Sequence, residues 1–161
     1  MIRVVDAEYN HVRNMFNRIR TIDQHEAYLA YGLPINQGLM YSWLKSRKNW
    51  ALLDDHDNTV AVFGVADSLY SSGEGSPWAI GTDDVELYPL QIAKLSRTCV
   101  KEMTRMYTFL SNYVYENNIT SKRWLEWCGF TLEEPAPFGL HGANFHRFYM
   151  KGEDSCVSQQ S

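Results

Sequence analysis

The sequence has no long hydrophobic run, and no stretch approaches the ~20 apolar residues that a membrane-spanning helix needs. Its first residues, MIRVVDAEYN, contain neither the basic segment nor the apolar segment of a secretory signal. Cysteine is scarce, and Cys99, Cys128 and Cys156 do not have the spacing of a metal site. We therefore expect a protein that stays in the cytoplasm where it is made, with free thiols and with neither a membrane segment nor a bound metal.

The chain also lacks a strong excess of charge of either sign. Its formal net charge is -4, which argues against nonspecific DNA binding, and we expect no specific nucleic-acid partner. With 161 residues, 45% of them hydrophobic, the chain has the length and composition of one globular domain. We place this domain at residues 1–151 and a flexible tail at 152–161, where apolar periodicity is absent.

Apolar residues at three- and four-residue steps predict the main helices. The first stripe runs from Val12 to Ile22, and the second runs from Leu39 to Leu44 and ends in the basic segment KSRKN. A long third helix begins near Pro89 and has its buried stripe between Ile92 and Met106. Its other face carries a row of basic residues, Lys94, Arg97, Lys101 and Arg105.

The strands are predicted by short β-favouring segments between turn residues. WALLD and TVAVFGVAD flank DHDN and read as a hairpin, and the loop SSGEGSP leads to the strand WAIGT. TFLSNYVY, FTLEEPAPFG and NFHRFYMK complete the set. The resulting order, β-α-α-β-β-β-α-β-α-β-β, predicts a mixed α/β (α+β) domain with a mostly antiparallel sheet flanked by helices.

Residues 116–130, ENNITSKRWLEWCGF, combine a strand end, a short helix and a glycine stop. Asn118 can satisfy free backbone groups, Thr120 can cap the helix, and Gly129 can end it in a left-handed turn. Together with the element order, Asn118, Gly129 and Phe130 resemble the N-x-x-A-x-x-x-Y-x-x-x-G-F pattern of the Gcn5-related N-acetyltransferase (GNAT) family. That resemblance implies splayed strands four and five that hold acetyl-CoA. Leu125 stands where the family often has a tyrosine general acid.

The same resemblance suggests where the cofactor and the catalytic base would lie. The family's phosphate pattern, Q/R-x-x-G-x-G/A, is matched by QIAKLS, in which Gln91 is in place and Lys94 and Ser96 replace glycines. Side-chain charge from Lys94 and Arg97 could partly replace backbone donors. The cofactor residues implied are Gln91, Lys94, Ser96, Arg97 and Asn118, and the candidates for the general base are Asp83, Asp84 and Glu86. These three acids could instead complement a helix dipole.

Other polar and aromatic residues also allow two interpretations. Tyr113 and Tyr115 could line an acceptor cleft, although alternating aromatic residues on a sheet usually pack in a core. His141 and His146 could move protons or could simply be solvated.

A second pattern is similar to a group of phage proteins with this fold, which includes internal virion proteins of short-tailed phages and phage acetyltransferase-like proteins. The residues that carry it are Trp78, Asp83, Asn112, Tyr113, Val114, Asn118, Arg123, Trp124, Leu125 and Gly129. The resemblance implies one of two functions, because a fold alone does not transmit an activity. One is an N-acetyltransferase that moves an acetyl group from acetyl-CoA to an amine in the host cytoplasm. The other is a non-enzymatic internal virion or assembly protein that binds a phage or host protein.

Overall fold

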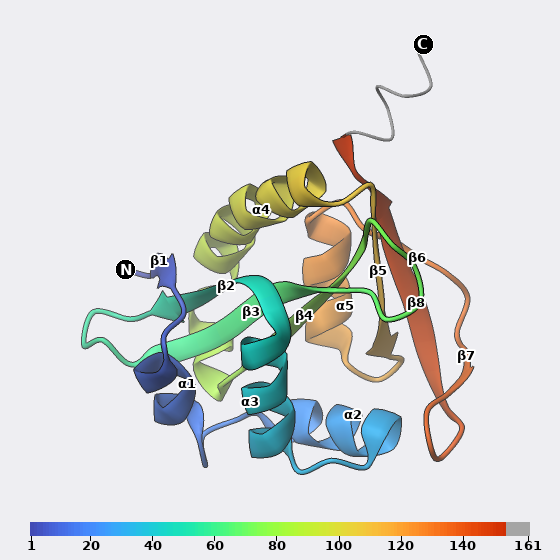
Figure 1. Cartoon of the computed structure of the whole chain (residues 1–161). Coiled ribbons are helices and arrows are strands. Elements are labelled where there is room, and N and C mark those ends of the chain that lie inside the picture. The colour runs from blue at the N-terminus through green and yellow to red at the C-terminus, as the bar shows by residue number, and fades with distance from the viewer. Residues whose placement is uncertain (154–161) are drawn as a thin grey trace.

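The computed structural model describes residues 1–153, in which helices and strands follow one another along most of the chain (Figure 1). The elements are β1 (Arg3–Asp6), α1 (Tyr9–Met15), α2 (Thr21–Tyr31), α3 (Ile35–Lys45), β2 (Ser46–Leu53), β3 (Thr59–Asp67), β4 (Glu74–Gly81), the 3-10 helix η1 (Asp83–Leu87), α4 (Pro89–Met106), β5 (Phe109–Tyr115), α5 (Ile119–Trp127), β6 (Thr131–Leu132), β7 (Ala136–Phe138) and β8 (Ala143–Lys151). Cys156 and most of the predicted tail lie outside the described residues.

The strands form one sheet in the order β1-β2-β3-β4-β5-β8-β6, with β7 also paired to β8. Neighbouring strands are antiparallel except β4 and β5, which α4 connects as a parallel crossover. These two strands pair only at Glu74 with Phe109 and at Gly75 with Leu110. They diverge toward their C-terminal ends, so the predicted mixed sheet with splayed strands four and five is confirmed.

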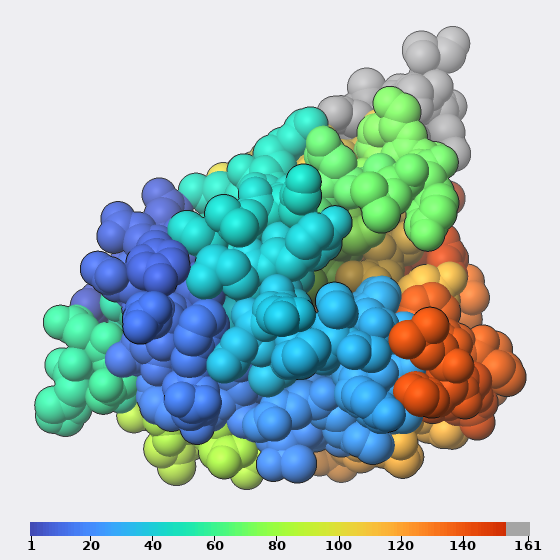
Figure 2. All heavy atoms as spheres, turned by 60° about the horizontal axis from the view of Figure 1, so that its bottom comes forward, coloured from blue at the N-terminus to red at the C-terminus, as the bar shows by residue number. Residues whose placement is uncertain are grey.

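Two hydrophobic clusters lie on the two faces of the sheet, because successive residues of a strand point to opposite sides. On β2, Trp50 and Leu52 belong to the cluster formed with α4 and α5, whereas Ala51 and Leu53 belong to the cluster formed with α1 and α3. In Figure 1, α3 crosses in front of the sheet and α5 lies behind it. Figure 2 shows α2, in blue, against the orange hairpin of β7 and β8. None of the helices within residues 1–153 combines the length and apolar composition needed to cross a membrane.

The predicted first helix, from Val12 to Ile22, is wrong in its extent. Helix α1 ends at Met15, and Asn17 then takes a left-handed conformation with φ of 68°. Asparagine tolerates this conformation better than most residues, so a helix can break there. Ile19 pairs with Thr82 beyond the end of β4, and α2 begins only at Thr21. The break brings the N-terminus of α2 to the end of β4.

Three strand boundaries also differ from the prediction. Most of KSRKN lies in β2 instead of ending a helix, because pairing with β3 extends back to Ser46. Strand β4 begins at Glu74, inside the predicted loop, because Glu74 and Gly75 pair with β5. The segment FTLEEPAPFG contains two short strands, and Pro135, which lies between them, cannot donate a ladder hydrogen bond.

Helix α5 confirms one local prediction and corrects another. Gly129 has φ of 100° and follows the end of the helix, as its predicted role requires. The N-cap is Asn118 instead of Thr120: the Asn118 side chain accepts a hydrogen bond from the Ser121 amide at 3.4 Å. Asn118 therefore connects the end of β5 to the start of α5.

Candidate active site at the gap between β4 and β5

The backbone groups on the edge of β4 that faces β5 have different hydrogen-bond partners at different positions. Backbone groups alternate in direction along an antiparallel strand, so Pro77, Ala79 and Gly81 present theirs to the gap while the residues between them pair with β3. The Pro77 carbonyl accepts a hydrogen bond from Asn112 Nδ2 at 2.8 Å. At Gly81 the carbonyl accepts from the Arg20 amide at 2.9 Å. The exposed Ala79 lies between these two positions, with its peptide at the edge of the gap.

The gap between β4 and β5 is widest at the C-terminal ends of the two strands, and two carboxylates of α2 connect the strands at this wide end. Asp23 Oδ2 accepts a hydrogen bond from the Gly81 amide of β4 at 2.9 Å. One helical turn later, Glu26 accepts a hydrogen bond from the backbone of Tyr115, at the end of β5. Asn118 Nδ2 donates to Asp23 Oδ1 at 3.4 Å and to Glu26 Oε2 at 2.7 Å. Helix α2 therefore supplies hydrogen-bond acceptors to backbone amides of β4 and β5 at the end where the two strands no longer pair with each other.

Arg20 completes this arrangement from the residue before α2. Its guanidinium forms a bidentate pair with Asp23, with distances of 3.1 and 2.8 Å, and Nη2 also donates to Ser121 Oγ at 3.2 Å. Arg20 and Asp23 are only 7% and 6% exposed. We refer to Arg20, Asp23, Glu26, Asn118 and Ser121 as the bridging network.

Glu26 has the most unusual electrostatic environment in the bridging network. Burial raises the pKa of its carboxyl from the ordinary 4.5 to about 7, and the nearby charge of Asp23 adds to that effect. Hydrogen bonds from Asn118 and from the Tyr115 backbone act in the opposite direction but do not cancel it. The side chain is half-buried, so solvent can still reach it. A carboxyl with such a pKa can accept and release a proton near neutral pH.

Two cavities adjoin the bridging network, and both are lined by Arg20 and Thr120. The larger, of about 310 Å³, is bounded by the start of α2, by Asp83 and Glu86 of η1, and by the start of α5. The smaller, of about 80 Å³, runs along β4 from Ala79 to Gly81 beneath α4 and α5. A cavity that contains two acids and a narrow, mostly apolar cavity therefore meet at Arg20 and Thr120.

Comparison with known proteins gives a result at the level of structure. No family model matches the sequence, and no curated protein matches it. Among solved structures, spermidine N-acetyltransferase from Vibrio cholerae in complex with CoA and spermine shares 14% identity, with TM-score 0.60 and coverage of 96% of this chain and 98% of that chain. A GNAT-family acetyltransferase from Streptococcus pneumoniae shares 9% identity, with TM-score 0.65 and coverage of 94% and 99%. The chain has the GNAT fold. The ribosomal-protein-S18-alanine N-acetyltransferase from Escherichia coli agrees, with 15% identity, TM-score 0.62 and coverage of 96% and 98%.

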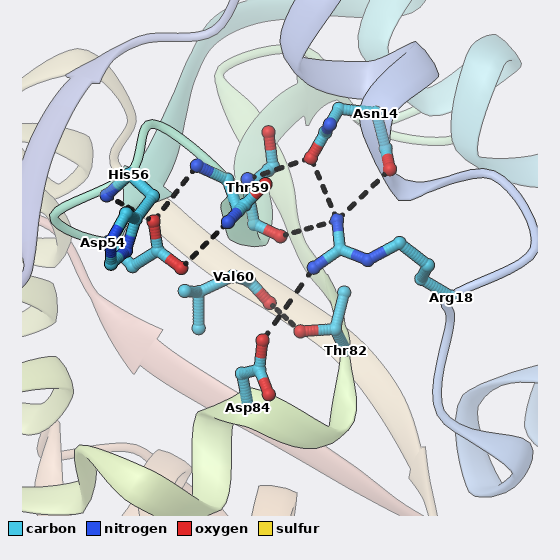
Figure 3. Close-up of polar contacts among 9 residues, drawn as sticks. Asn14, Arg18, Asp54, His56, Thr59, Val60, Thr82 and Asp84 are labelled. Carbon is cyan, nitrogen blue, oxygen red and sulfur yellow. Dashed lines mark hydrogen bonds and ion pairs between the residues drawn. The ribbon is translucent and has the colours of Figure 1, made fainter.

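Within this GNAT fold, the three acids predicted as candidates for the general base are separated. Asp83 and Glu86 line the larger cavity. Asp84 instead pairs with Arg18 at 3.6 Å, and Figure 3 shows that Arg18 also reaches Asn14 on α1. Asp84 therefore connects η1, through Arg18, to the end of α1.

The predicted cofactor residues of α4 do not converge on one surface. Gln91 Oε1 accepts a hydrogen bond from the Ile2 amide at 2.8 Å. Ser96 is fully buried, where its hydroxyl donates to the Ile92 carbonyl at 2.6 Å and accepts from Trp124 Nε1 at 2.9 Å. Arg97 donates to the Trp127 carbonyl at 3.0 Å, and its guanidinium lies over the Trp127 ring. Lys94 is exposed, and Asn118, the fifth residue of the predicted set, lies in the bridging network.

These residues fit one end of acetyl-CoA better than the other. The narrow cavity beside Ala79 has the apolar lining and the free strand edge that suit an acyl chain. Phosphates need backbone amides or positive charge, whereas η1, just before α4, carries Asp83, Asp84 and Glu86. Lys94 is the one predicted phosphate-binding residue of α4 that is exposed and makes none of the contacts described above for Gln91, Ser96 and Arg97.

Sequence reasoning missed Asp23 and Glu26, the two acids of the bridging network. A signal was present, because these acids are three residues apart and share the inward face of α2 with Ala30, which is 7% exposed. Acids one turn apart on a face that also carries a buried alanine indicate a buried polar contact. Apart from Arg20, which pairs with Asp23, the partners described above lie more than 50 residues away along the chain.

Proposed function

We propose that the protein transfers an acetyl group from acetyl-CoA to an amine. The observation that carries the proposal is the Glu26 carboxyl, which has a pKa of about 7 and stands at the wide end of the gap. Three structural neighbours are N-acetyltransferases or GNAT acetyltransferases by name, and one of them was solved with CoA and spermine. The fold, the gap and the titratable carboxyl together support the reaction class more strongly than any of them does alone.

Each part of the site would have a separate task. Acetyl-CoA, when bound, supplies a thioester whose acetyl group an amine can attack. The Ala79 peptide and the narrow cavity would hold its acyl end, with Lys94 near its phosphates. An amine reaches the site mostly as an ammonium ion at neutral pH and must lose a proton before it can attack. The ionised Glu26 carboxylate would accept that proton, and Asn118 would hold Oε2 in place at 2.7 Å.

Acetyl transfer from acetyl-CoA to a panel of primary amines, followed by the release of CoA, tests the proposal. Replacing Glu26 with glutamine keeps the shape of the side chain but removes the base, so we expect the rate to fall by about 10²- to 10⁴-fold. The wild-type rate should rise with pH through about 7, as Glu26 ionises. Glu102→Gln, on the exposed face of α4, is the matched control and should keep the rate. A folded Glu26→Gln variant with full activity would exclude Glu26 as the base.

A second candidate function is supported by the start of α4. If the acids of η1 and the engaged side chains of Gln91 and Ser96 prevent acetyl-CoA from binding, the fold would serve to bind a phage or host protein during virion assembly. The sequence pattern shared with phage virion proteins is the argument for that context. The test is to add acetyl-CoA at millimolar concentration. If no heat of binding is detected and the melting temperature does not rise, this function is favoured over the enzyme.

A further inference from the structure

The outer side of α4 carries a row of basic residues that packing against the sheet does not use. Three- and four-residue steps place them on one side of the helix, and all are exposed: Lys94, Arg97, Lys101 and Arg105. The opposite side of α4 contains the buried residues Ser96 and Met103. The acid Glu102 lies off the row, because it is about 100° around the helix from Lys101.

Helix α5 extends this surface with an aromatic ring and a further cation. The Arg97 guanidinium donates to the Trp127 carbonyl at 3.0 Å and lies over the Trp127 ring, 4.9 Å from its centroid. Trp127 is nevertheless 52% exposed, so part of the indole remains open to solvent. Arg123 lies one helical turn before Trp127 and is also exposed. We refer to Arg97, Lys101, Arg123 and Trp127 as the α4–α5 face.

The net charge of -4 does not describe this face, because six of the acids lie elsewhere. Three are in η1 and three are in the turn between β2 and β3: Asp83, Asp84, Glu86, Asp54, Asp55 and Asp57. Near the face, Glu126 is an exposed acid of α5, and Glu153 pairs with Arg105 at 3.5 Å. Within residues 1–153, none of the three cations of the α4–α5 face forms an ion pair. Their charges are therefore available to an anionic partner.

We propose that the α4–α5 face binds single-stranded nucleic acid, with phosphates at its three cations and one base stacked on Trp127. Arg97 and Lys101 are about 6 Å apart along the helix axis, so each can meet a different phosphate of a strand that follows α4. An exposed indole is a stacking platform for any base, whereas an acidic protein segment has no need of one. Unpaired cations beside an open aromatic ring therefore favour a nucleic acid over an acidic peptide.

Binding of this kind uses the nucleic-acid backbone and stacking, so it does not depend on base sequence. It is also independent of the proposed function. Lys94, which would lie near the phosphates of acetyl-CoA, is not part of the α4–α5 face, and the face is tested without the cofactor.

The test is the fluorescence anisotropy of a labelled oligothymidylate titrated with the full chain, and a labelled polyglutamate peptide of the same charge is the second probe. We expect saturable binding of the oligothymidylate at low salt and weaker binding of polyglutamate. Contacts to three phosphates predict a slope of about -2 for the logarithm of affinity against the logarithm of salt concentration. The affinity should therefore fall about 20-fold between about 50 and 200 mM salt.

Two substitutions separate the role of charge from the role of stacking. Lys101→Ala should weaken binding and make the salt slope less steep by about 0.7, because one phosphate contact is lost. Trp127→Leu should weaken oligothymidylate binding by about 5- to 150-fold and leave polyglutamate binding unchanged, because it removes a stacked base. Trp127→Tyr, which keeps an aromatic ring, should bind nearly as well as wild type. Melting curves check that each variant is folded.

Lys45 and Tyr41 provide matched controls on α3, which packs on the other face of the sheet. The Lys45 ammonium lies 6.0 Å from the centroid of the Tyr41 ring, and Tyr41 is 55% exposed. Lys45→Ala and Tyr41→Leu should bind like wild type, and losses equal to those of Lys101→Ala and Trp127→Leu would overturn the location. Equal affinity for polyglutamate, or unchanged oligothymidylate binding in Trp127→Leu, would mean that the face binds acidic protein segments by charge alone. No binding of the oligothymidylate to wild type at low salt would exclude nucleic acid as the partner.

Discussion

The wide end of the gap and the start of α4 lie at opposite ends of one short connection, from Gly81 to Pro89, yet they are built from different groups. At the wide end, Gly81 has both backbone groups bonded, and the carboxyl that joins β5 titrates near neutral pH. At the start of α4, three acids stand where a phosphate would need donors, and Gln91 is bonded to the N-terminal strand region. The difference indicates that the residues of this chain suit the acyl end of the proposed cofactor better than its phosphate end.

The largest expected effect concerns the structural role of the wide end. Asp23→Ala leaves the Arg20 guanidinium buried without its carboxylate, and breaking a buried ion pair in this way costs about 3–5 kcal/mol. Urea denaturation should show this loss in the free energy of unfolding. Asp55→Ala removes an exposed partner of the N-terminus and should change stability by less than about 1 kcal/mol. If the two variants were equally stable, the bridging network would not hold the gap together.

The next effect is a dependence of stability on pH that comes from Glu26. The folded protein holds the Glu26 proton up to a pKa of about 7, whereas the unfolded chain loses it near 4.5. The folded state therefore binds more protons between these values, and its stability should fall as pH rises from about 4.5 to about 7. The free energy of unfolding should fall by at most about 3 kcal/mol over this pH range, and by less if solvent screens the half-buried carboxyl.

Melting curves of wild type and Glu26→Gln measured across this pH range isolate the contribution of Glu26. The difference in stability between the two proteins should change by this amount between pH 4.5 and 7 and should be constant below 4.5. Parallel curves over the whole range would mean that Glu26 titrates in the folded protein as it does in water.

The two regions also differ in how far sequence can predict them. The roles of Asn118 and Gly129 follow from local rules, since a helix needs donors satisfied at its start and a left-handed residue after its end. The element order and the splay of β4 and β5 follow from periodicity together with a family resemblance. The pKa of Glu26 could not be predicted in this way, because burial in the folded protein raises it and a hydrogen bond from Asn118, which is 92 residues away, opposes that effect. The predicted role of Ser96 came from its position in the family's phosphate pattern, and in the structure the residue is buried against Trp124.

The far end of α5 provides a local test that leaves both regions intact. Gly129→Val should lower the free energy of unfolding by about 1–2 kcal/mol or more, because φ of 100° is strained for a residue with a Cβ. A Cβ at this position would also lie 3.3 Å from Met150 Cε. Gly38→Val is the control, because Gly38 lies in α3 and a Cβ there would have nothing within 4 Å. Equal melting temperatures for the two variants would contradict the role given to Gly129.

The smallest expected effect tests how the proposed cofactor, acetyl-CoA, would be held, and it is measured by calorimetry at low ionic strength. Because Lys94 is exposed, its charge is well solvated, and Lys94→Glu should weaken acetyl-CoA binding by only about 2- to 10-fold. Added salt should weaken the wild-type complex as well, since exposed charges are screened over about 10 Å at 0.1 M salt. Lys101→Glu makes the same change of charge two turns further along α4 and should have a smaller effect. Equal losses in the two variants would point to attraction by the overall charge of the helix.

A double variant, Asp83→Asn with Glu86→Gln, removes the acids of the larger cavity and should bind acetyl-CoA more tightly than wild type, because phosphates are then no longer repelled there. If this variant and wild type both fail to bind, the start of α4 is not a phosphate site, and the role of the fold as a binding protein is the one to pursue.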